Sequence, residues 1–110
     1  MDTWCSGTGY SDYQAVQSDI TQMSTDVGNG DYGTAENADA TRLNSDAGTA
    51  LQNPPPGTTA QKVSYISYMG AITFAAADLN SGNIAAAETA MSGAAKYRDG
   101  ADVLVAACSS

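Results

Sequence analysis

Apolar residues recur at alternating spacings of three and four along most of this 110-residue chain. Such spacing places them on one face of an α-helix. Three polar or glycine- and proline-rich stretches interrupt the pattern, namely "GNGD" at 28–31, "NPPPG" at 53–57 and "SGN" at 81–83. We therefore predict four helices and an irregular N-terminal segment, with the helices over about residues 12–27, 32–52, 59–80 and 84–107 and the irregular segment over 1–10.

Residues at the predicted helix ends fit this division. Ser11 with Gln14, and Thr58 with Gln61, have the spacing of capping boxes, in which each side chain satisfies a free backbone N–H of the other residue. Asp31 can cap the second helix. Proline in "NPPPG" ends that helix, because proline lacks the backbone donor and clashes with the preceding turn.

The two halves of the chain repeat each other at a separation of 52 residues. "DVGNGDYGTAENA" begins at residue 26 and "DLNSGNIAAAETA" at residue 78, and in both a glycine can end one helix before Asp or Asn caps the next. The equivalent pairs are Tyr13 and Tyr65, Val16 and Tyr68, Ile20 and Ile72, Val27 and Leu79, Gly30 and Gly82, Tyr32 and Ile84, Ala35 and Ala87, Glu36 and Glu88. Two helical hairpins with short connections predict a single all-α domain over 1–110, an antiparallel up-down-up-down four-helix bundle.

Acidic residues outnumber basic ones by 12 to 4, which gives a net charge of −8. Binding of nucleic acid needs clustered Lys and Arg that neutralise phosphates, so this balance argues against a nucleic-acid partner. It also argues against adsorption to an anionic membrane surface. Because the chain has no run of about 18 apolar residues, we expect no membrane span.

The two cysteines, Cys5 and Cys108, stand near opposite ends of the sequence. An up-down-up-down bundle brings both ends of its chain to the same end of the molecule, so we expect these residues to form a disulfide. Disulfides persist in oxidising compartments. We therefore expect a mature form, after signal removal, that is secreted or held at the cell surface.

The order of these features resembles a known group of proteins. An Ala/Thr/Asp-rich hairpin, then "LQNPPP", then a second hairpin with "LNSGN" is similar to uncharacterised small secreted or lipoprotein-type helical proteins of actinobacteria. The resemblance covers most of the chain. It implies a secreted or surface location and supplies no activity, cofactor or site residue.

The sequence offers little for catalysis or metal binding. It contains no histidine, which di-metal bundles use as a ligand and many nucleophilic sites use as a base, and we predict no catalytic residue, metal or cofactor. Glu36 and Glu88, the only glutamates, occupy equivalent positions in the two hairpins. They could converge as a carboxylate pair, but the favoured interpretation is that each complements the positive end of its helix dipole.

Charged residues also fall on helix faces that should be apolar. One line of residues on the fourth helix follows heptad spacing and is predicted to face the core: Ile84, Ala87, Met91, Ala94, Arg98, Ala101 and Val105. Arg98 is therefore predicted on the core-facing side, where Asp102, one turn later, is the expected ion-pair partner. Asp39, Arg42 and Asp46 form a comparable stripe on the second helix. These residues could form a polar ligand cleft between the second and fourth helices, but the favoured interpretation is an ion-paired edge of the bundle.

The third helix is apolar on two sides. One face carries Tyr65, Tyr68, Ile72, Ala75 and Leu79, and the second carries Val63, Ile66, Gly70, Phe74 and Ala77. A helix that is apolar all round is either buried on both sides or exposes an apolar patch. Gly70 would let a partner helix approach closely, so we predict a homodimer or protein-partner interface at the second face, with burial inside the bundle as the alternative.

These features together predict a secreted, non-enzymatic helical bundle that acts by protein–protein interaction or self-association through its third helix. A small-ligand carrier or weak enzyme that uses the polar cleft is the first alternative. A purely structural surface protein is the second.

Overall fold

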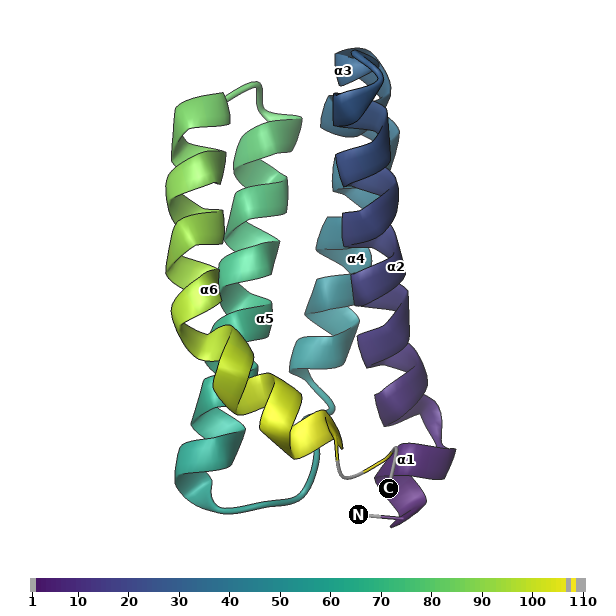
Figure 1. The fold of residues 1–110 in the computed structure, drawn as a ribbon, viewed down its shortest axis with the longest axis vertical. Coiled ribbons are helices and arrows are strands. Elements are labelled where there is room, and N and C mark those ends of the chain that lie inside the picture. Colours follow the sequence, from purple (N-terminus) through teal and green to yellow (C-terminus); the bar gives the residue numbers. More distant parts are fainter. Residues whose placement is uncertain (1, 107, 109–110) are drawn as a thin grey trace.

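The computed structural model describes residues 2–106 and residue 108, and the regular elements in this part of the chain are all helical. In chain order they are α1 (Asp2–Ser6), α2 (Thr8–Gly28), α3 (Tyr32–Thr34), the π-helical turn η1 (Ala35–Asp39), α4 (Ala40–Leu51), α5 (Thr59–Asn80) and α6 (Ile84–Ala106). The long helices lie side by side in a molecule of 39 × 23 × 20 Å (Figure 1). The predicted all-α fold class is therefore confirmed.

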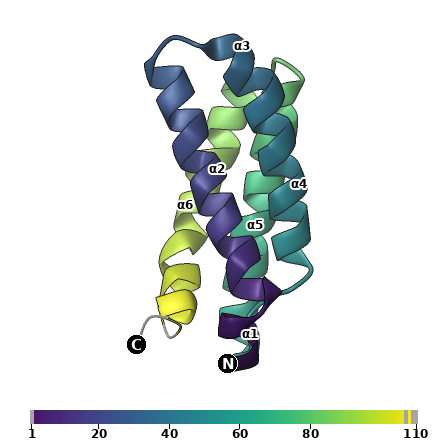
Figure 2. The same ribbon diagram turned by 90° about the vertical axis from the view of Figure 1, so that its right-hand side faces the viewer.

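Two helical hairpins make up the molecule. α2 and α4 form the first hairpin, with α3 and η1 between them, and α5 and α6 form the second (Figure 1). α4 packs against α5 and joins the hairpins, whereas no comparable packing joins α2 to α6 among the described residues. Figure 2 shows α2 crossing the near side of the molecule at a slant. The edge between α2 and α6 is consequently the least tightly packed edge of the molecule.

α5 begins and ends where the sequence predicts, at Thr59 and Asn80. Thr58 and Gln61 form the expected capping box at its N-terminus. The backbone N–H of Gln61 donates to Thr58 Oγ1 at 3.2 Å, and the backbone N–H of Thr58 donates to Gln61 Oε1 at 2.9 Å. The reciprocal pair satisfies two donors that the first turn of a helix leaves free, which fixes the start of α5.

The two turns inside the hairpins use glycine as the sequence repeat predicts. Gly30 and Gly82 adopt φ values of 76° and 80°, a left-handed conformation that costs glycine little. After the first turn, the backbone N–H of Thr34 donates to the side chain of Asp31 at 3.4 Å, so Asp31 is the predicted cap. Asn83 lies immediately before α6.

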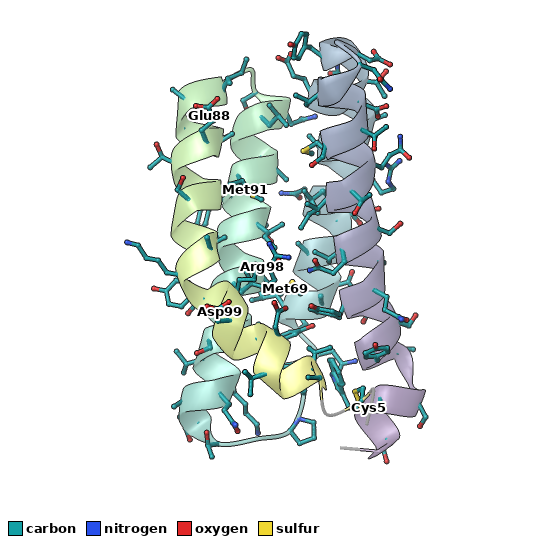
Figure 3. All side chains as sticks on the ribbon, in the orientation of Figure 1. Cys5, Met69, Glu88, Met91, Arg98 and Asp99 are labelled. Carbon is teal, nitrogen blue, oxygen red and sulfur yellow. A yellow bond between two sulfur atoms is a disulfide. The ribbon has the colours of Figure 1, made fainter. Side chains whose placement is uncertain are left out.

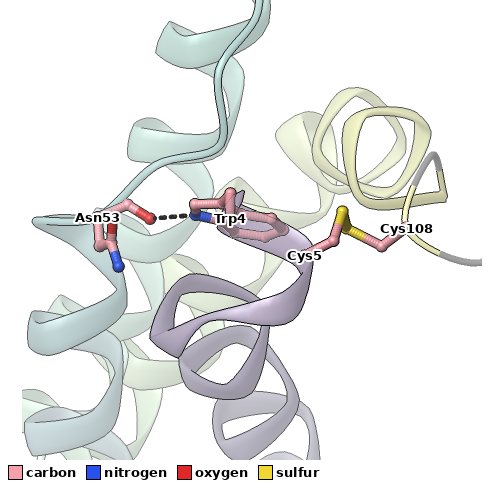
Figure 4. Close-up of a disulfide and its surroundings, with 4 residues drawn as sticks. All are labelled: Trp4, Cys5, Asn53 and Cys108. Atoms are coloured by element: carbon pink, nitrogen blue, oxygen red, sulfur yellow. Dashed lines mark hydrogen bonds between the residues drawn. A yellow bond between two sulfur atoms is a disulfide. The ribbon is translucent and has the colours of Figure 1, made fainter. Parts of the chain in front are cut away.

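The N-terminal segment is helical, and the prediction of an irregular segment over 1–10 is wrong for the residues described. α1 covers Asp2–Ser6 and α2 begins directly after Gly7, so Ser11 lies inside α2 and is not a cap. Tertiary contacts of Trp4 explain why this segment is helical. Trp4 is only 7% exposed, and its indole Nε1 donates to the carbonyl oxygen of Asn53 at 2.7 Å (Figure 4). A buried aromatic ring with a satisfied N–H holds this segment against the bundle.

The second predicted helix, over 32–52, is also not continuous. Residues Ala35–Asp39 form the π-helical turn η1, a geometry that occurs often at functional sites. Beyond it α4 ends at Leu51, one residue before the predicted end. α6 ends at Ala106, and its predicted last residue, 107, lies outside the described residues.

Cys5 and Cys108 form the predicted disulfide, with their Cα atoms 5.3 Å apart (Figure 4). They meet because the C-terminal part of α6 swings across the lower end of the molecule toward α1 (Figure 1). The bond links residues 103 apart in sequence, for which chain-entropy arguments give about 4 to 5 kcal/mol of stabilisation. Trp4 packs edge-on against Tyr10 and Tyr65, each with ring centroids 6.0 Å away, and ties the same end of the molecule together.

Gly9 offers a test of how closely α1 packs on α2. A Cβ atom added at Gly9 would overlap the indole of Trp4, whereas one added at Gly48 in α4 would meet no neighbouring atom within 4 Å. We expect Gly9→Ala to lower the free energy of unfolding by about 1–3 kcal/mol through overpacking. Gly48→Ala should raise it by up to about 1 kcal/mol, because alanine favours the helix. Urea denaturation measures both changes, and equal effects would contradict the position of Trp4.

Candidate functional site

A cavity of about 470 Å³ lies between the two hairpins, at the end of the molecule opposite the disulfide. It forms where α2 and α6 lack the packing that joins the other neighbouring helices. Side chains from both hairpins line it: Met23, Val27, Tyr32, Ala35, Glu36, Leu43, Ala75, Ala76, Leu79, Ile84, Ala87, Glu88, Met91 and Ser92. The lining is therefore mostly apolar, with two carboxylates and the hydroxyls of Ser92 and Tyr32 added.

The sequence repeat maps onto this cavity. Five pairs of lining residues stand 52 positions apart, namely Met23 and Ala75, Val27 and Leu79, Tyr32 and Ile84, Ala35 and Ala87, Glu36 and Glu88. The repeated segments thus build both hairpin turns and opposite walls of the same cavity. Three of these apolar side chains, Val27, Tyr32 and Ile84, remain exposed to solvent. Uncovered apolar side chains around a concave site are typical of ligand-binding surfaces.

The cavity continues along the groove between α2 and α6 as a second hollow of about 200 Å³. Met91 borders both hollows, and Arg98 lies further down α6, beside the smaller one (Figure 3). Toward the disulfide the groove is bridged, because the hydroxyl of Tyr13 on α2 donates to Asp102 Oδ1 on α6 at 2.9 Å. The groove is therefore bridged near the disulfide, and the larger of its two hollows lies near the hairpin turns.

This groove corrects the predicted burial of one line of residues on α6. Heptad spacing placed Ile84, Met91 and Arg98 toward the core, yet all three are exposed and the Arg98 side chain is 62% exposed. Because α2 does not pack closely on α6, these residues border the groove, while Ala94 on the adjoining line is buried. The expected ion pair does form, with Arg98 Nε 3.6 Å from Asp102 Oδ2, but at the surface such a pair contributes little to stability.

The structure divides the predicted polar cleft into two groups. Asp39 and Arg42 line a hollow of about 350 Å³ between α2 and the first part of the η1–α4 segment, and Asp46 lies one turn further along α4. Arg98 and Asp102 belong to α6, and Arg98 borders the groove instead. The two hollows are lined by different residues of α2, so the five side chains do not converge on one ligand. A single polar cleft is therefore wrong, because α2 separates the two groups.

One guanidinium group serves two buried carboxylates in the first of these groups. Arg42 donates from Nε to Asp19 Oδ1 at 3.0 Å and from Nη2 to Asp39 Oδ1 at 2.8 Å. Asp19 is 6% exposed and Asp39 is 2% exposed. The second oxygen of each carboxyl group, Oδ2, has no hydrogen-bond partner among the described residues. Arg42 thus compensates only part of the negative charge that these buried groups would carry.

The pKa values of both buried acids are raised for the same reasons. Burial raises the pKa of Asp19 to about 6, and the neighbouring carboxylate of Asp46 adds to this effect, while Arg42 opposes it. Burial also raises the pKa of Asp39, and Asp26 contributes in the same direction against Arg42. In each case the charged form loses hydration and faces a second carboxylate. These two carboxyl groups, near the middle of the first hairpin, therefore bind a proton at higher pH than an ordinary aspartate does.

Asp19 was not predicted as a site residue, and Met91 was predicted to lie in the core. Asp19 follows Val16 by three residues and directly precedes Ile20, so it borders the α2 face that the spacing predicts to be apolar. A charge at the edge of an apolar face was the signal that could have identified it. No comparable signal distinguishes Met91, because its exposure depends on the separation of two helices that are distant in sequence.

Glu36 and Glu88 both line the cavity, one from each hairpin. Each also lies near the start of its helical arm, so the favoured interpretation, charge complementing a helix dipole, and the carboxylate-pair interpretation are compatible. Glu36 is half-buried within η1, and Glu88 is exposed on the first turns of α6 (Figure 3). Neither carboxylate makes an ion pair or a side-chain hydrogen bond with any residue that the structure describes.

The second apolar face of α5 is uncovered in the described part of the chain. Val63, Ile66, Phe74 and Ala77 are exposed, and Phe74 is 72% exposed. Gly70, half-buried, stands at the middle of this face with no atom within 4 Å of the position its Cβ would take. Burial inside the bundle, the alternative interpretation of this face, is therefore wrong. The predicted interface itself stays a prediction.

The described residues offer neither a metal site nor a membrane-spanning helix. No group of three or more His, Cys, Asp or Glu side chains is arranged to hold a metal ion in the part of the chain that is described. None of the described helices combines the length and the apolar character that a membrane crossing requires. The cavity between the hairpins is the candidate site that the geometry favours.

The raised pKa of Asp19 has a consequence for stability. Because its folded-state pKa of about 6 lies above the ordinary value near 3.9, the folded chain binds this proton more tightly than the unfolded chain. Protonation of Asp19 therefore stabilises the folded chain fully below about pH 4, and this stabilisation is lost as the pH rises through about 6. We therefore expect Asp19→Asn, which keeps an oxygen acceptor for Arg42, to raise the free energy of unfolding at pH 7 by up to about 2 kcal/mol.

Thermal unfolding followed by circular dichroism between pH 4 and 7 measures this effect. Asp99→Asn is the matched control, because it removes one carboxylate that is exposed on α6. The pH dependence of the melting temperature should flatten in Asp19→Asn and persist in Asp99→Asn. Identical slopes in the two variants would contradict the assignment.

No protein-family model, curated protein or solved structure matches this chain. The side chains that line the cavity form an apolar chamber with one carboxylate from each hairpin.

Proposed function

We propose that this protein is a secreted, non-enzymatic binding protein that holds a small, largely apolar molecule in the cavity between its hairpins. The observation that carries the proposal is the cavity, whose walls come from both hairpins and are lined mainly by alanine and larger aliphatic side chains. Its volume of about 470 Å³ falls within the range of about 300–1,000 Å³ that is usual for small-molecule sites.

Burial of apolar surface supplies the driving force. A ligand in the cavity would cover Val27, Tyr32 and Ile84, which are exposed without it. Each Å² of apolar surface removed from water contributes about 25 cal/mol, on the protein and on the ligand alike. Among the lining residues, polar side-chain groups are limited to the hydroxyls of Ser92 and Tyr32 and the two glutamates, so binding relies mainly on apolar burial.

The proposal takes the chain as the predicted antiparallel up-down-up-down four-helix bundle, with the α2–α6 edge incompletely closed. Its location outside the reducing cytosol, secreted or at the cell surface, is supported by the Cys5–Cys108 disulfide. The resemblance to small secreted helical proteins of actinobacteria agrees with this location. A purely structural surface protein would have no use for an apolar cavity that opens to solvent.

Binding of the neutral fluorescent probe N-phenyl-1-naphthylamine tests the proposal. Its emission rises in apolar surroundings, and we expect saturable binding to the native protein. Met91→Asp should weaken the probe's affinity at least about tenfold, since it places a charge beside both hollows. Met91 is partly exposed, so the fold should tolerate this change, and far-UV circular dichroism verifies that it does.

Val103→Asp is the matched control for this experiment. Val103 is exposed on the same helix and does not line the cavity. The proposal requires that this variant bind the probe like the native protein. Absence of saturable binding by the native protein, or equal losses in the two variants, would contradict it and favour the structural alternative.

Self-association through α5 is a second candidate function, and the exposed apolar face of that helix favours it. The occupant we propose is a second copy of this chain, because the residues of the face are spaced symmetrically about Gly70. Ile66 and Phe74 stand four residues on either side, and Val63 and Ala77 stand seven residues on either side. In an antiparallel dimer each residue meets the level of its counterpart, so Phe74 packs beside Ile66 and Val63 faces Ala77.

The geometry of α5 permits both functions at once. Ala75, Ala76 and Leu79 line the cavity from the opposite side of the helix, so a dimer would leave the cavity open. α5 is only about 33 Å long, which is short for an interface of about 800 Å² per partner. Edges of α4 and α6 would have to contribute, and we expect a weak dimer.

Sedimentation equilibrium at protein concentrations up to about 100 µM tests this candidate. The native protein should associate reversibly, and Phe74→Asp should remain monomeric, because the new charge would be desolvated in the interface. Tyr32→Asp, which alters an exposed aromatic residue at the cavity, is the control and should associate normally. A native protein that is monomeric at every concentration would exclude the dimer.

A further inference from the structure

The charged groups of the cavity are all of one sign. Among its lining residues, Glu36 and Glu88 are acidic, and neither lysine nor arginine is present. The two carboxylates come from different hairpins and occupy equivalent positions in the sequence repeat. An apolar chamber with two carboxylates would accept a molecule with an apolar body and would attract a positive charge attached to it.

The basic side chains nearest to the cavity in the fold are engaged elsewhere. Arg42 donates to Asp19 and Asp39 on the far side of α2, and Arg98 pairs with Asp102 further down α6. Glu36 and Glu88 make no ion pair or side-chain hydrogen bond among the described residues. Two carboxylates beside apolar surface, with no counter-charge from the described chain, would be neutralised by a cation that the ligand brings.

Glu36 is also held in place more firmly than a surface glutamate. It belongs to the π-helical turn η1, and its backbone carbonyl oxygen accepts a hydrogen bond from Asn80 Nδ2 at 3.1 Å. The same amide group of Asn80 donates to Thr41 Oγ1, also at 3.1 Å. Because Asn80 ends α5, this contact ties the first hairpin to the second beside the cavity and fixes the backbone from which Glu36 projects.

The field of the whole molecule acts in the same direction. A net charge of −8 raises the local concentration of cations and repels anions at low ionic strength. A cationic group would therefore be attracted before it reaches the carboxylates. A free carboxylate on the ligand would be repelled unless it reached Arg98 in the adjoining hollow.

We propose that the ligand of this cavity is a cationic amphiphile, an amine or quaternary ammonium group on an apolar body, and that Glu36 and Glu88 bind its positive group. This inference rests on the proposed function, because it names the chemical class that the cavity takes. Ammonium and carboxylate would meet in partly desolvated surroundings, where their attraction is stronger than in water. The apolar body lies against the alanine and aliphatic walls.

Three ligands with the same ten-carbon chain test this inference: decyltrimethylammonium, decanol and decanoate. Each competes with N-phenyl-1-naphthylamine for the native protein, below its own micelle concentration. Decyltrimethylammonium should displace the probe at a concentration at least about tenfold lower than decanol, and decanoate should be the weakest competitor. The quaternary ammonium has no titrating proton, so its charge is the same at every pH. Added salt should reduce this preference.

Substitutions separate a local site from general attraction. Glu36→Gln and Glu88→Gln should each reduce the preference for the ammonium over decanol, and the double variant should abolish it while binding the neutral probe normally. Asp99→Asn removes the same charge from an exposed position on α6 outside the cavity and should keep the preference. Equal effects of Asp99→Asn and the glutamate substitutions would show that only the net charge matters, which would overturn the inference.

The failures of the two proposals are distinguishable. If the native protein does not bind the neutral probe, the proposed function fails. If it binds the probe but does not prefer the ammonium over decanol, only the cationic ligand is excluded. If decanoate is the best competitor and Arg98→Gln removes that preference, the ligand is anionic and is held by the adjoining hollow.

Discussion

The covalent bond between Cys5 and Cys108 ties the two hairpins together at one end, and the rest of the arrangement depends on it. Trp4 packs beside this bond and donates to Asn53 in the connection between the hairpins. At the other end the hairpins are joined mainly by α4 packing on α5. A molecule that is tied at one end and packed along one side can remain open along the opposite edge. The cavity lies at that edge, where it is farthest from the disulfide.

The distribution of charge follows from how few basic residues the chain has. Two of the four are arginines, and both are committed to aspartates: Arg42 to Asp19 and Asp39, and Arg98 to Asp102. The two lysines are exposed and do not line the cavity. The one arginine of the first hairpin, Arg42, therefore pairs with buried aspartates between α2 and α4. No basic residue remains within the cavity to oppose its two glutamates.

Local signals predicted the helices well where they alone decide the structure. The capping box at Thr58 and the turn glycines Gly30 and Gly82 fixed helix ends correctly. The same reasoning failed at α1, because burial of Trp4 against a connection about 50 residues away determines that segment. It also failed to foresee η1, since no residue type in "AENAD" demands a π-helical turn.

The candidate site was predictable only in part, for a physical reason. The repeat placed Glu36 and Glu88 in equivalent positions, and that equivalence is what brings them to one cavity. The cavity itself required the distance between α2 and α6, which spacing along the chain does not contain. Heptad spacing assumes that every core-facing residue meets a neighbouring helix. The assumption does not hold for Arg98 and Met91, because no helix packs closely on them and both remain exposed.

The equivalence of the two hairpins has a consequence for how a ligand can lie. A cavity whose opposite walls carry paired residues presents similar surfaces to a molecule and to the same molecule turned end over end. Three of the five pairs differ, namely Met23 with Ala75, Val27 with Leu79 and Tyr32 with Ile84, and these differences, together with the unpaired lining residues and the π-helical turn in the first hairpin, make the two orientations unequal. In the first and third of these pairs the bulkier side chain belongs to the first hairpin, whereas Leu79 of the second hairpin is bulkier than Val27. These differences between the two halves give the nearly symmetric cavity two distinguishable ends.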